Sequence, residues 1–140
     1  MSPEIAVIER IKDLSTVADD RVYMLRLPQH STLPAVVVQL IDDPEEYHLR
    51  GGSTFGRARV QIDSYAEETS GGDPYSTASA LADQINGDDA GSGLSGFQGS
   101  IGSPPFTVTG AFRQDRRAEY EPDELRLVRL RMDFFVHYRQ

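Results

Sequence analysis

Residue types that commonly carry out chemistry are scattered in this chain. The histidines at 30, 48 and 137 are isolated from one another, and none lies four residues from another metal ligand on a helix. Cysteine is absent, which excludes a thiolate metal site and a cysteine nucleophile. The carboxylates of "DDPEE" (42–46) and "GDDAG" (87–91) lack the spacing of a calcium loop. Asp63 with Tyr65 is the first candidate for acid–base chemistry, although a hydrogen-bonded structural aspartate is the commoner role.

Two glycine-rich stretches match part of a catalytic motif but lack residues that the motif requires. The stretch 51–58, "GGSTFGRA", has the glycine spacing of a phosphate-binding loop, but Arg57 replaces its lysine and Ala58 its Ser/Thr. It also leads into a predicted strand, so no helix N-terminus faces a phosphate. The stretch 93–97, "GLSGF", lacks the final glycine of Gly-x-Ser-x-Gly. We therefore expect no active site, no cofactor and no metal.

Charge limits the classes of partner. The 140-residue chain has a net charge of −8, and from Val60 to Phe112 it contains no Lys or Arg. A nucleic-acid module needs a basic surface, so sequence-specific nucleic-acid binding is disfavoured. Arginine dominates the basic residues, as Lys12 is the only lysine, and arginine suits protein interfaces. No apolar run is long enough to span a membrane, and the N-terminus lacks signal-peptide features, so we expect a soluble protein made in a cytoplasm, with no membrane partner.

The elements that would position these residues follow from periodicity and from capping residues. Ser2-Pro3 and Asp73-Pro74 each predict a helix start, and Gly87 predicts the end of the second helix. The β-branched run 33–41 predicts a central strand covered on both faces. The expected order is a helix at 3–14, strands at 22–28, 33–41 and 55–69, a helix at 73–87, a mobile loop at 87–104, and strands at 106–114 and 125–138 joined by 115–124.

Strict alternation marks two of these strands. The residues Ala58, Val60, Ile62, Ser64 and Ala66 form an apolar or small set that faces a core, while the opposite set is Arg57, Arg59, Gln61, Asp63 and Tyr65. The last strand also alternates, and its length of roughly 46 Å exceeds a compact diameter of roughly 37 Å. It must therefore bend strongly or protrude as a hairpin arm. The chain is predicted to be a single α+β domain, 1–140, with a mixed, mostly antiparallel sheet, two helices on one face and a long C-terminal β-hairpin.

Several stretches in order resemble a known family. They are "RVYMLRLPQHSTLPAVVVQ", "GRARVQIDSYA", "ASALADQI", "LSGFQGSIG" and "YEPDELRLVRLRMDFFVHYR". Together, from Arg21 to the C-terminus, they resemble the tail-completion, or tail-terminator, proteins of long-tailed phages and prophages. The resemblance implies a non-enzymatic virion part that forms a sixfold ring at the head-proximal end of the tail after assembly in the host cytoplasm. Its implied partners are other copies of itself, the tail tube protein and a head completion or connector protein.

Given this resemblance, the polar strand face 57–65 is a candidate surface for a neighbouring subunit or the tail tube. For the hairpin we hypothesise a second ring patch of Arg113, Arg116, Arg117, Tyr120, Arg129 and Arg131. Asp88 and Asp89 are candidates for lining a channel through which DNA passes. A head-side connector or stopper is the nearest alternative. A small cytoplasmic ligand-binding protein or enzyme of bacterial origin, using Asp63, Tyr65 and a histidine, is a further one.

Overall fold

The backbone is organised around one long sheet. In this computed structural model, the described residues are 2–29, 31–44, 47–48, 51–52, 55–67, 73–102, 105–121 and 124–139. His30, Ser53, Thr54 and the last residues of the predicted strand 55–69 therefore lie outside them. In chain order the elements are α1 (Pro3–Asp13), β1 (Val22–Met24), β2 (Ala35–Asp42), β3 (Tyr47–His48), β4 (Gly51–Gly52), β5 (Phe55–Glu67), α2 (Pro74–Asn86), β6 (Gly99–Ile101), β7 (Phe106–Glu121) and β8 (Glu124–Arg139).

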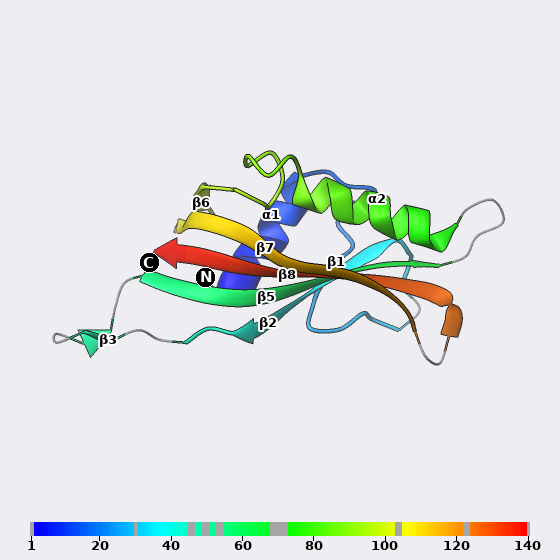
Figure 1. Ribbon diagram of the computed structural model, residues 1–140, viewed down its shortest axis with the longest axis horizontal. Coiled ribbons are helices and arrows are strands. Elements are labelled where there is room, and N and C mark those ends of the chain that lie inside the picture. The colour runs from blue at the N-terminus through cyan, green and yellow to red at the C-terminus, as the bar shows by residue number, and fades with distance from the viewer. Residues whose placement is uncertain are drawn as a thin grey trace.

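Six strands pair in the order β1-β2-β5-β8-β7-β6. The β1–β2 pair is parallel and the other neighbours are antiparallel. Strands β3 and β4 form a separate two-stranded hairpin (Figure 1). The mixed, mostly antiparallel sheet and the two helices confirm the predicted α+β class.

Both helices lie on one face of the sheet (Figure 1). Helix α1 packs over β1 and β2, and α2 packs over β5 and β8. Asp73 caps α2 by accepting a hydrogen bond from the Tyr75 amide at 3.1 Å, and Gly87 ends it with a φ of 74°, as the sequence predicts. The core lies between these two layers, with Ile11, Leu81 and Ile85 from the helices fully buried against the sheet.

The alternation read from the sequence is confirmed in β5 and β8. The even-numbered residues from Ala58 to Ala66 of β5 and from Val128 to Tyr138 of β8 point toward the helices and are buried. In β2, Ala35–Val38 is buried on both faces as predicted, although β2 lies next to the terminal strand β1 rather than at the centre. Val37 is 4% exposed although it lies across from Asp63, on the face opposite the helices.

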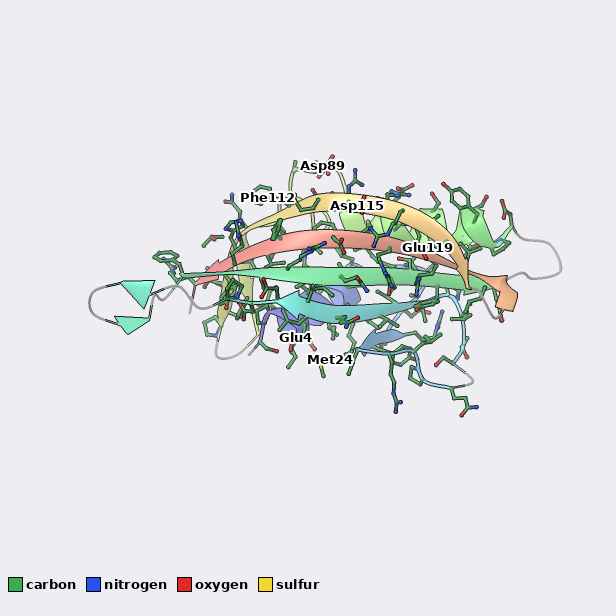
Figure 2. All side chains as sticks on the ribbon, turned by 60° about the horizontal axis from the view of Figure 1, so that its bottom comes forward. Glu4, Met24, Asp89, Phe112, Asp115 and Glu119 are labelled. Atoms are coloured by element: carbon green, nitrogen blue, oxygen red, sulfur yellow. The ribbon has the colours of Figure 1, made fainter. Side chains whose placement is uncertain are left out.

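The C-terminal hairpin differs from its prediction. Strand β7 continues to Glu121, so most of the expected connection 115–124 is strand. The partner strand β8 pairs with β5 from Arg139 opposite Phe55 to Leu127 opposite Glu67, so the hairpin is not a free arm. It bends instead: the β7–β8 register shifts at three places, and β7 arches over the sheet (Figure 2).

Of the segment expected to be a mobile loop, 87–104, the described part 87–102 is built into the fold. It contains β6, and both Leu94 and Ser95 are buried. Arg10 of α1 donates hydrogen bonds to the carbonyls of Gly91 at 3.0 Å and Gly93 at 3.1 Å. Its guanidinium also lies 4.1 Å from the ring centroid of Phe97. A single helix side chain thus organises a glycine-rich turn, which composition alone could not indicate.

Candidate functional site

The face of the sheet that the helices leave uncovered carries most of the charged side chains singled out by the sequence. We call it the charged face: Arg57, Arg59, Gln61, Asp63 and Tyr65 of β5, Asp115, Arg117 and Glu119 of β7, and Arg129, Arg131, Asp133, Phe135 and His137 of β8. Cross-strand register brings these residues together, because side chains directly opposite on neighbouring strands share a face.

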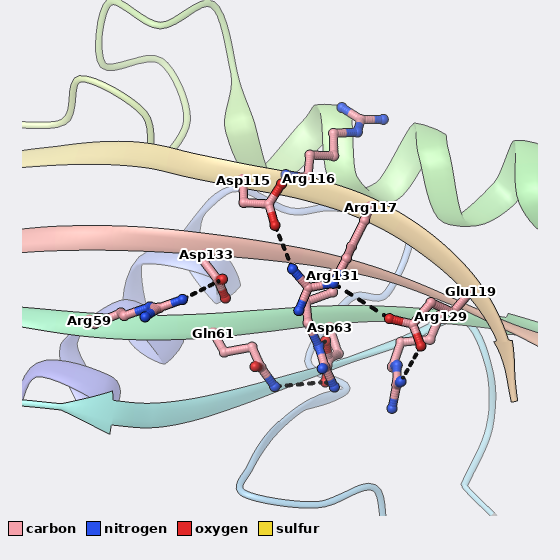
Figure 3. A network of polar contacts seen from close by, with 10 residues as sticks. All are labelled: Arg59, Gln61, Asp63, Asp115, Arg116, Arg117, Glu119, Arg129, Arg131 and Asp133. Atoms are coloured by element: carbon pink, nitrogen blue, oxygen red, sulfur yellow. Dashed lines mark hydrogen bonds and ion pairs between the residues drawn. The ribbon is translucent and has the colours of Figure 1, made fainter.

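Two carboxylates of the charged face are buried and paired. Asp63 accepts a hydrogen bond from Nε of Arg131 at 2.9 Å, directly across from it on β8 (Figure 3). Asp133 accepts one from Nη2 of Arg59 at 3.1 Å, diagonally across the same strands. Their side chains are 8% and 4% exposed, because the long arginine stems lie over them. This burial makes Asp63 a structural aspartate, the commoner role that the sequence allowed.

Toward the hairpin tip the pairing continues between β7 and β8. Arg129 donates to Glu119 at 2.9 Å, and this hydrogen bond is the main reason why the pKa of Glu119 lies below its ordinary value. Burial alone would lower the pKa of Arg129, but hydrogen bonds with Tyr65 and Glu119 outweigh it and raise that pKa. The hydrogen bond to Asp63 is the main cause of the raised pKa of Arg131. Arg129 and Arg131 therefore remain charged.

Like charges also stand opposite each other, and neighbours neutralise them. Arg117 lies across from Arg131, and Asp115 lies across from Asp133. Arg117 pairs along its own strand with Asp115 and with Glu119, whose oxygen lies 3.5 Å from Nε. The result is a surface of interlocked positive and negative groups with fixed geometry, suited to a protein partner rather than to a small substrate.

Aromatic rings occupy the other end of the charged face. The Arg57 guanidinium lies 5.0 Å from the ring centroid of Phe135, and the rings of Phe112 and His137 meet edge to face at 5.6 Å. Phe112 nevertheless stays 50% exposed. Exposed aromatics beside arginines are a composition typical of interface centres.

The predicted second ring patch is divided between the two faces. Arg117, Arg129 and Arg131 lie on the charged face, whereas Arg113 and Arg116 point toward α2. Arg116 donates to Asp83 at 2.6 Å and to Ser79 at 3.0 Å, so it holds the helix against β7. The side chain of Tyr120 lies outside the described part of the chain.

Asp88 and Asp89 form a tight turn after α2. Asp88 accepts hydrogen bonds from the amides of Ala90 at 2.9 Å and Ser92 at 3.3 Å, and Asp89 accepts one from Asn86 at 3.0 Å. The pKa of each is lowered, chiefly by the amide of Ala90 for Asp88 and by the hydroxyl of Ser95 for Asp89. Both residues are exposed in the turn that follows α2, where Figure 2 labels Asp89.

The predicted interface residues omitted three carboxylates of the charged face, Asp115, Glu119 and Asp133, and two of its rings, Phe135 and His137. The alternation of the last strand already placed Asp133 on the same face as Arg129 and Arg131. Its negative charge near two arginines was the signal in the sequence that could have identified it. Asp115 and Glu119 fell in the segment predicted as a connection. From Arg113 to Glu121 their strand is mostly charged or polar, and such a pattern gives no apolar period to recognise.

Within the described ranges, no cluster of three or more His, Asp or Glu side chains is arranged to hold a metal ion. None of the helices described here has the length and apolarity needed to cross a membrane. The site is thus a charged sheet face with an aromatic end.

Comparison with known proteins decides what kind of molecule carries this face. The model of the family "Tail completion protein gp17" matches residues 6–138. The chain belongs to this family. It is therefore a structural protein of the phage virion tail and not an enzyme, as the resemblance read from the sequence implied. As a virion component it associates with other virion proteins.

Solved structures share the fold of this tail completion protein. Thirty chains match, among them one from the "Virion of native gene transfer agent (GTA) particle". That match has a TM-score of 0.56 at 13% sequence identity and covers 99% of this chain and 96% of the other. No curated protein matches the chain in sequence.

Proposed function

We propose that six copies of this tail completion protein form a ring on the finished tail tube, stop its growth and offer the surface to which the head connector binds. The observation that carries the proposal is the charged face: broad, uncovered by helices, and held in one geometry by its own ion pairs. A preorganised face loses little conformational freedom on docking, which favours a protein partner. The fold of the gene transfer agent virion chain is consistent with this role.

In this proposal the charged face packs on the last ring of the tail tube. Tube growth stops because the face covers the groups on which the next tube ring would assemble. Alternating charges give the docking orientation, since a misplaced partner brings like charges together. The exposed arginines Arg57 and Arg117 are the residues we assign to this contact, because Arg59 and Arg131 already neutralise buried carboxylates.

The DNA that leaves the head passes through the ring. Asp88 and Asp89 are our candidates for channel lining, because their lowered pKa values keep both carboxylates charged and charged carboxylates repel phosphate. Replacing both by lysine is expected to slow DNA ejection, measured as DNA release from purified particles. Unchanged ejection kinetics would show that the turn containing Asp88 and Asp89 does not line the channel.

The ring function is tested by deleting the gene from the source phage or prophage and imaging the lysate by electron microscopy. Overlong tubes without heads are the expected result. Tails of normal length beside unattached, filled heads would assign joining alone, the role of a head-side connector. Unchanged particles would overturn the proposal.

Complementation of the deletion strain with variants tests whether the charged face, rather than another part of the surface, contacts the tail tube. Arg57→Glu with Arg117→Glu is expected to leave the fold intact but fail to restore tail length. Lys12→Glu, on α1 and away from this face, is the matched control and is expected to restore it. Equal rescue by both variants would show that the tube contacts another surface.

A further inference from the structure

The two outer edges of the sheet differ in shape, and each is open. Strand β6 pairs only with Phe106–Val108 of β7, and Gly96 adds one bond to the carbonyl of Ala111 at 2.8 Å. Beyond Ala111, no described strand pairs with the outer side of β7. At the opposite edge, β1 is the terminal strand among those described. Open edges invite strand-to-strand contact with another chain.

The β7 edge carries a projecting ring, Phe112. A Cβ added to Gly110 would lie 2.9 Å from a ring carbon of Phe112, so the ring rests over the glycine backbone. Its edge contact with His137 fixes the ring from the other side. Phe112 is therefore held in place and yet half exposed, although burial of such a ring is strongly favourable.

The β1 edge carries a groove. It has a volume of about 690 Å³ and is lined by Tyr23, Met24, Arg26, Leu27, Pro28 and Gln29. Between Met24 and Arg26, Leu25 is 65% exposed with a φ of 75°, a conformation that leucine disfavours. Strain together with an exposed apolar side chain is typical of a recognition segment.

Figure 2 shows Met24 and Phe112 at opposite edges of the sheet. We propose that Phe112 of one copy inserts into the groove beside Met24 of the next copy, and that this contact, repeated head to tail, closes the ring. A projecting group and a receiving pocket on different parts of one surface generate a ring when the rotation closes. The inference rests on the proposed ring function, since it names the surfaces through which the ring is built.

Charge favours a second copy as the occupant. Asp115 follows Phe112 on β7, is 48% exposed and lies across from a second carboxylate, Asp133. The arginines of the same stretch contact α2 or pair with Asp115 and Glu119. The groove contains Arg26, whose exposed side chain has no ion pair or hydrogen bond within the described residues. In a chain of net charge −8, copies repel unless opposite charges meet at the contact. Arg26 of one copy placed opposite Asp115 of the next supplies that complement.

Because the chain has no native cysteine, crosslinking tests this contact directly. Gln29→Cys lies at the groove and Gln114→Cys lies two residues from Phe112, and both variants keep Phe112, Met24 and Arg26. Assembled tails that carry the double variant are treated with a short bifunctional maleimide. They are expected to give a ladder of crosslinked species whose largest member has the mass of the complete ring. Each single variant is the matched control and is expected to give none, because a head-to-tail contact never brings identical positions together.

Two results would overturn the inference. A ring visible in tails of the double variant without any ladder would place the contact elsewhere and leave the proposed function standing. Linked dimers from Gln114→Cys alone would show a two-fold contact. Failure of the unmodified gene to restore tail length in the deletion strain would instead refute the proposed function.

Substitution of the Phe112 side chain gives an independent test of the contact between copies. Phe112→Ala is expected to weaken association between copies about tenfold or more, the effect of a central aromatic anchor, measured as ring recovery against protein concentration. Phe55→Ala removes a phenylalanine that is 56% exposed on β5, away from both edges, and is the control expected to assemble normally. Equal loss in both variants, or in neither, contradicts the assignment.

Discussion

Phe134 and Phe135 are neighbours in β8, yet they belong to two different kinds of surface. Phe134 points toward the helices and is fully buried, whereas Phe135 lies on the charged face beneath Arg57. One face of the sheet is held by apolar burial under α1 and α2. The other is held by ion pairs and stacked rings that belong to the sheet itself. The difference shows how a sheet can keep one face for its own stability and preorganise the other for a partner.

The largest effect should come from the helix-covered face. Phe134→Ala is expected to lower the free energy of unfolding by about 3–5 kcal/mol, because it leaves a cavity in a closed core. Phe135→Ala should cost only about 1 kcal/mol, since its ring is half-buried and covered by one arginine. Urea denaturation of both variants measures the difference. Similar losses would mean that the two faces are equally well packed.

The next effect concerns the buried ion pair of the charged face. Asp63→Ala should cost about 2–3 kcal/mol, because Arg131 loses the carboxylate that compensates its partial burial. A double-mutant cycle with Arg131→Ala should give a coupling free energy of about 2 kcal/mol. Gln61→Ala, on the same strand with a weaker 3.4 Å bond to Asp63, is the control and should change stability little. A coupling near zero would show that the pair does not hold the charged face together.

A smaller contrast comes from two adjacent arginines of β7. Arg116→Ala should cost about 1 kcal/mol, because it breaks two hydrogen bonds that hold α2. Arg117→Ala should cost less than about 0.5 kcal/mol, as its side chain is 47% exposed and its ion pairs are solvated. Thermal unfolding of the two variants decides the order. The reverse order would mean that α2 is held by apolar contacts alone.

The smallest effect is the pH dependence of the pair between Glu119 and Arg129. Because the pKa of Glu119 is lowered in the folded protein, the stabilisation is present above the ordinary glutamate pKa of about 4.3 and is lost as the pH falls through the lower, folded value. The gap in melting temperature between the wild-type protein and Glu119→Gln should therefore shrink on acidification below that range. A gap independent of pH would show that the carboxylate charge makes no contribution.

Prediction from the sequence succeeded where a period or a cap has a direct physical cause. Asp73-Pro74 and Gly87 delimit α2. The aspartate accepts a hydrogen bond from an amide that has no partner within the helix, and glycine tolerates a positive φ. Alternation assigned each residue of β5 to the correct face, because side chains of a strand point alternately to its two sides. The same rule placed Arg57, Arg59 and Asp63 together on the charged face.

Prediction failed where long-range pairing overrides composition. Asp115 and Glu119 lie in a strand only because β8 offers a partner along its whole length, and no local propensity signals that. The glycine-rich segment 87–104 becomes ordered structure through Arg10, a residue from the other end of the chain. Arg113 and Arg116 were grouped with Arg117. Alternation alone sends the neighbours Arg116 and Arg117 to opposite faces, and the register shift between Arg113 and Asp115 moves Arg113 to the helix face.

By itself, the sequence determined the periods and caps of the main elements, the α+β class and, through the order of its phrases, the family. Local chemistry suffices for these, because each depends on neighbours in the chain. Only the tertiary structure decided which charges meet, that Asp63 and Asp133 are buried, and that an exposed Phe112 and a groove beside Met24 lie on opposite edges. Those relations join residues far apart in the chain, and they exist only after strand pairing has fixed one register.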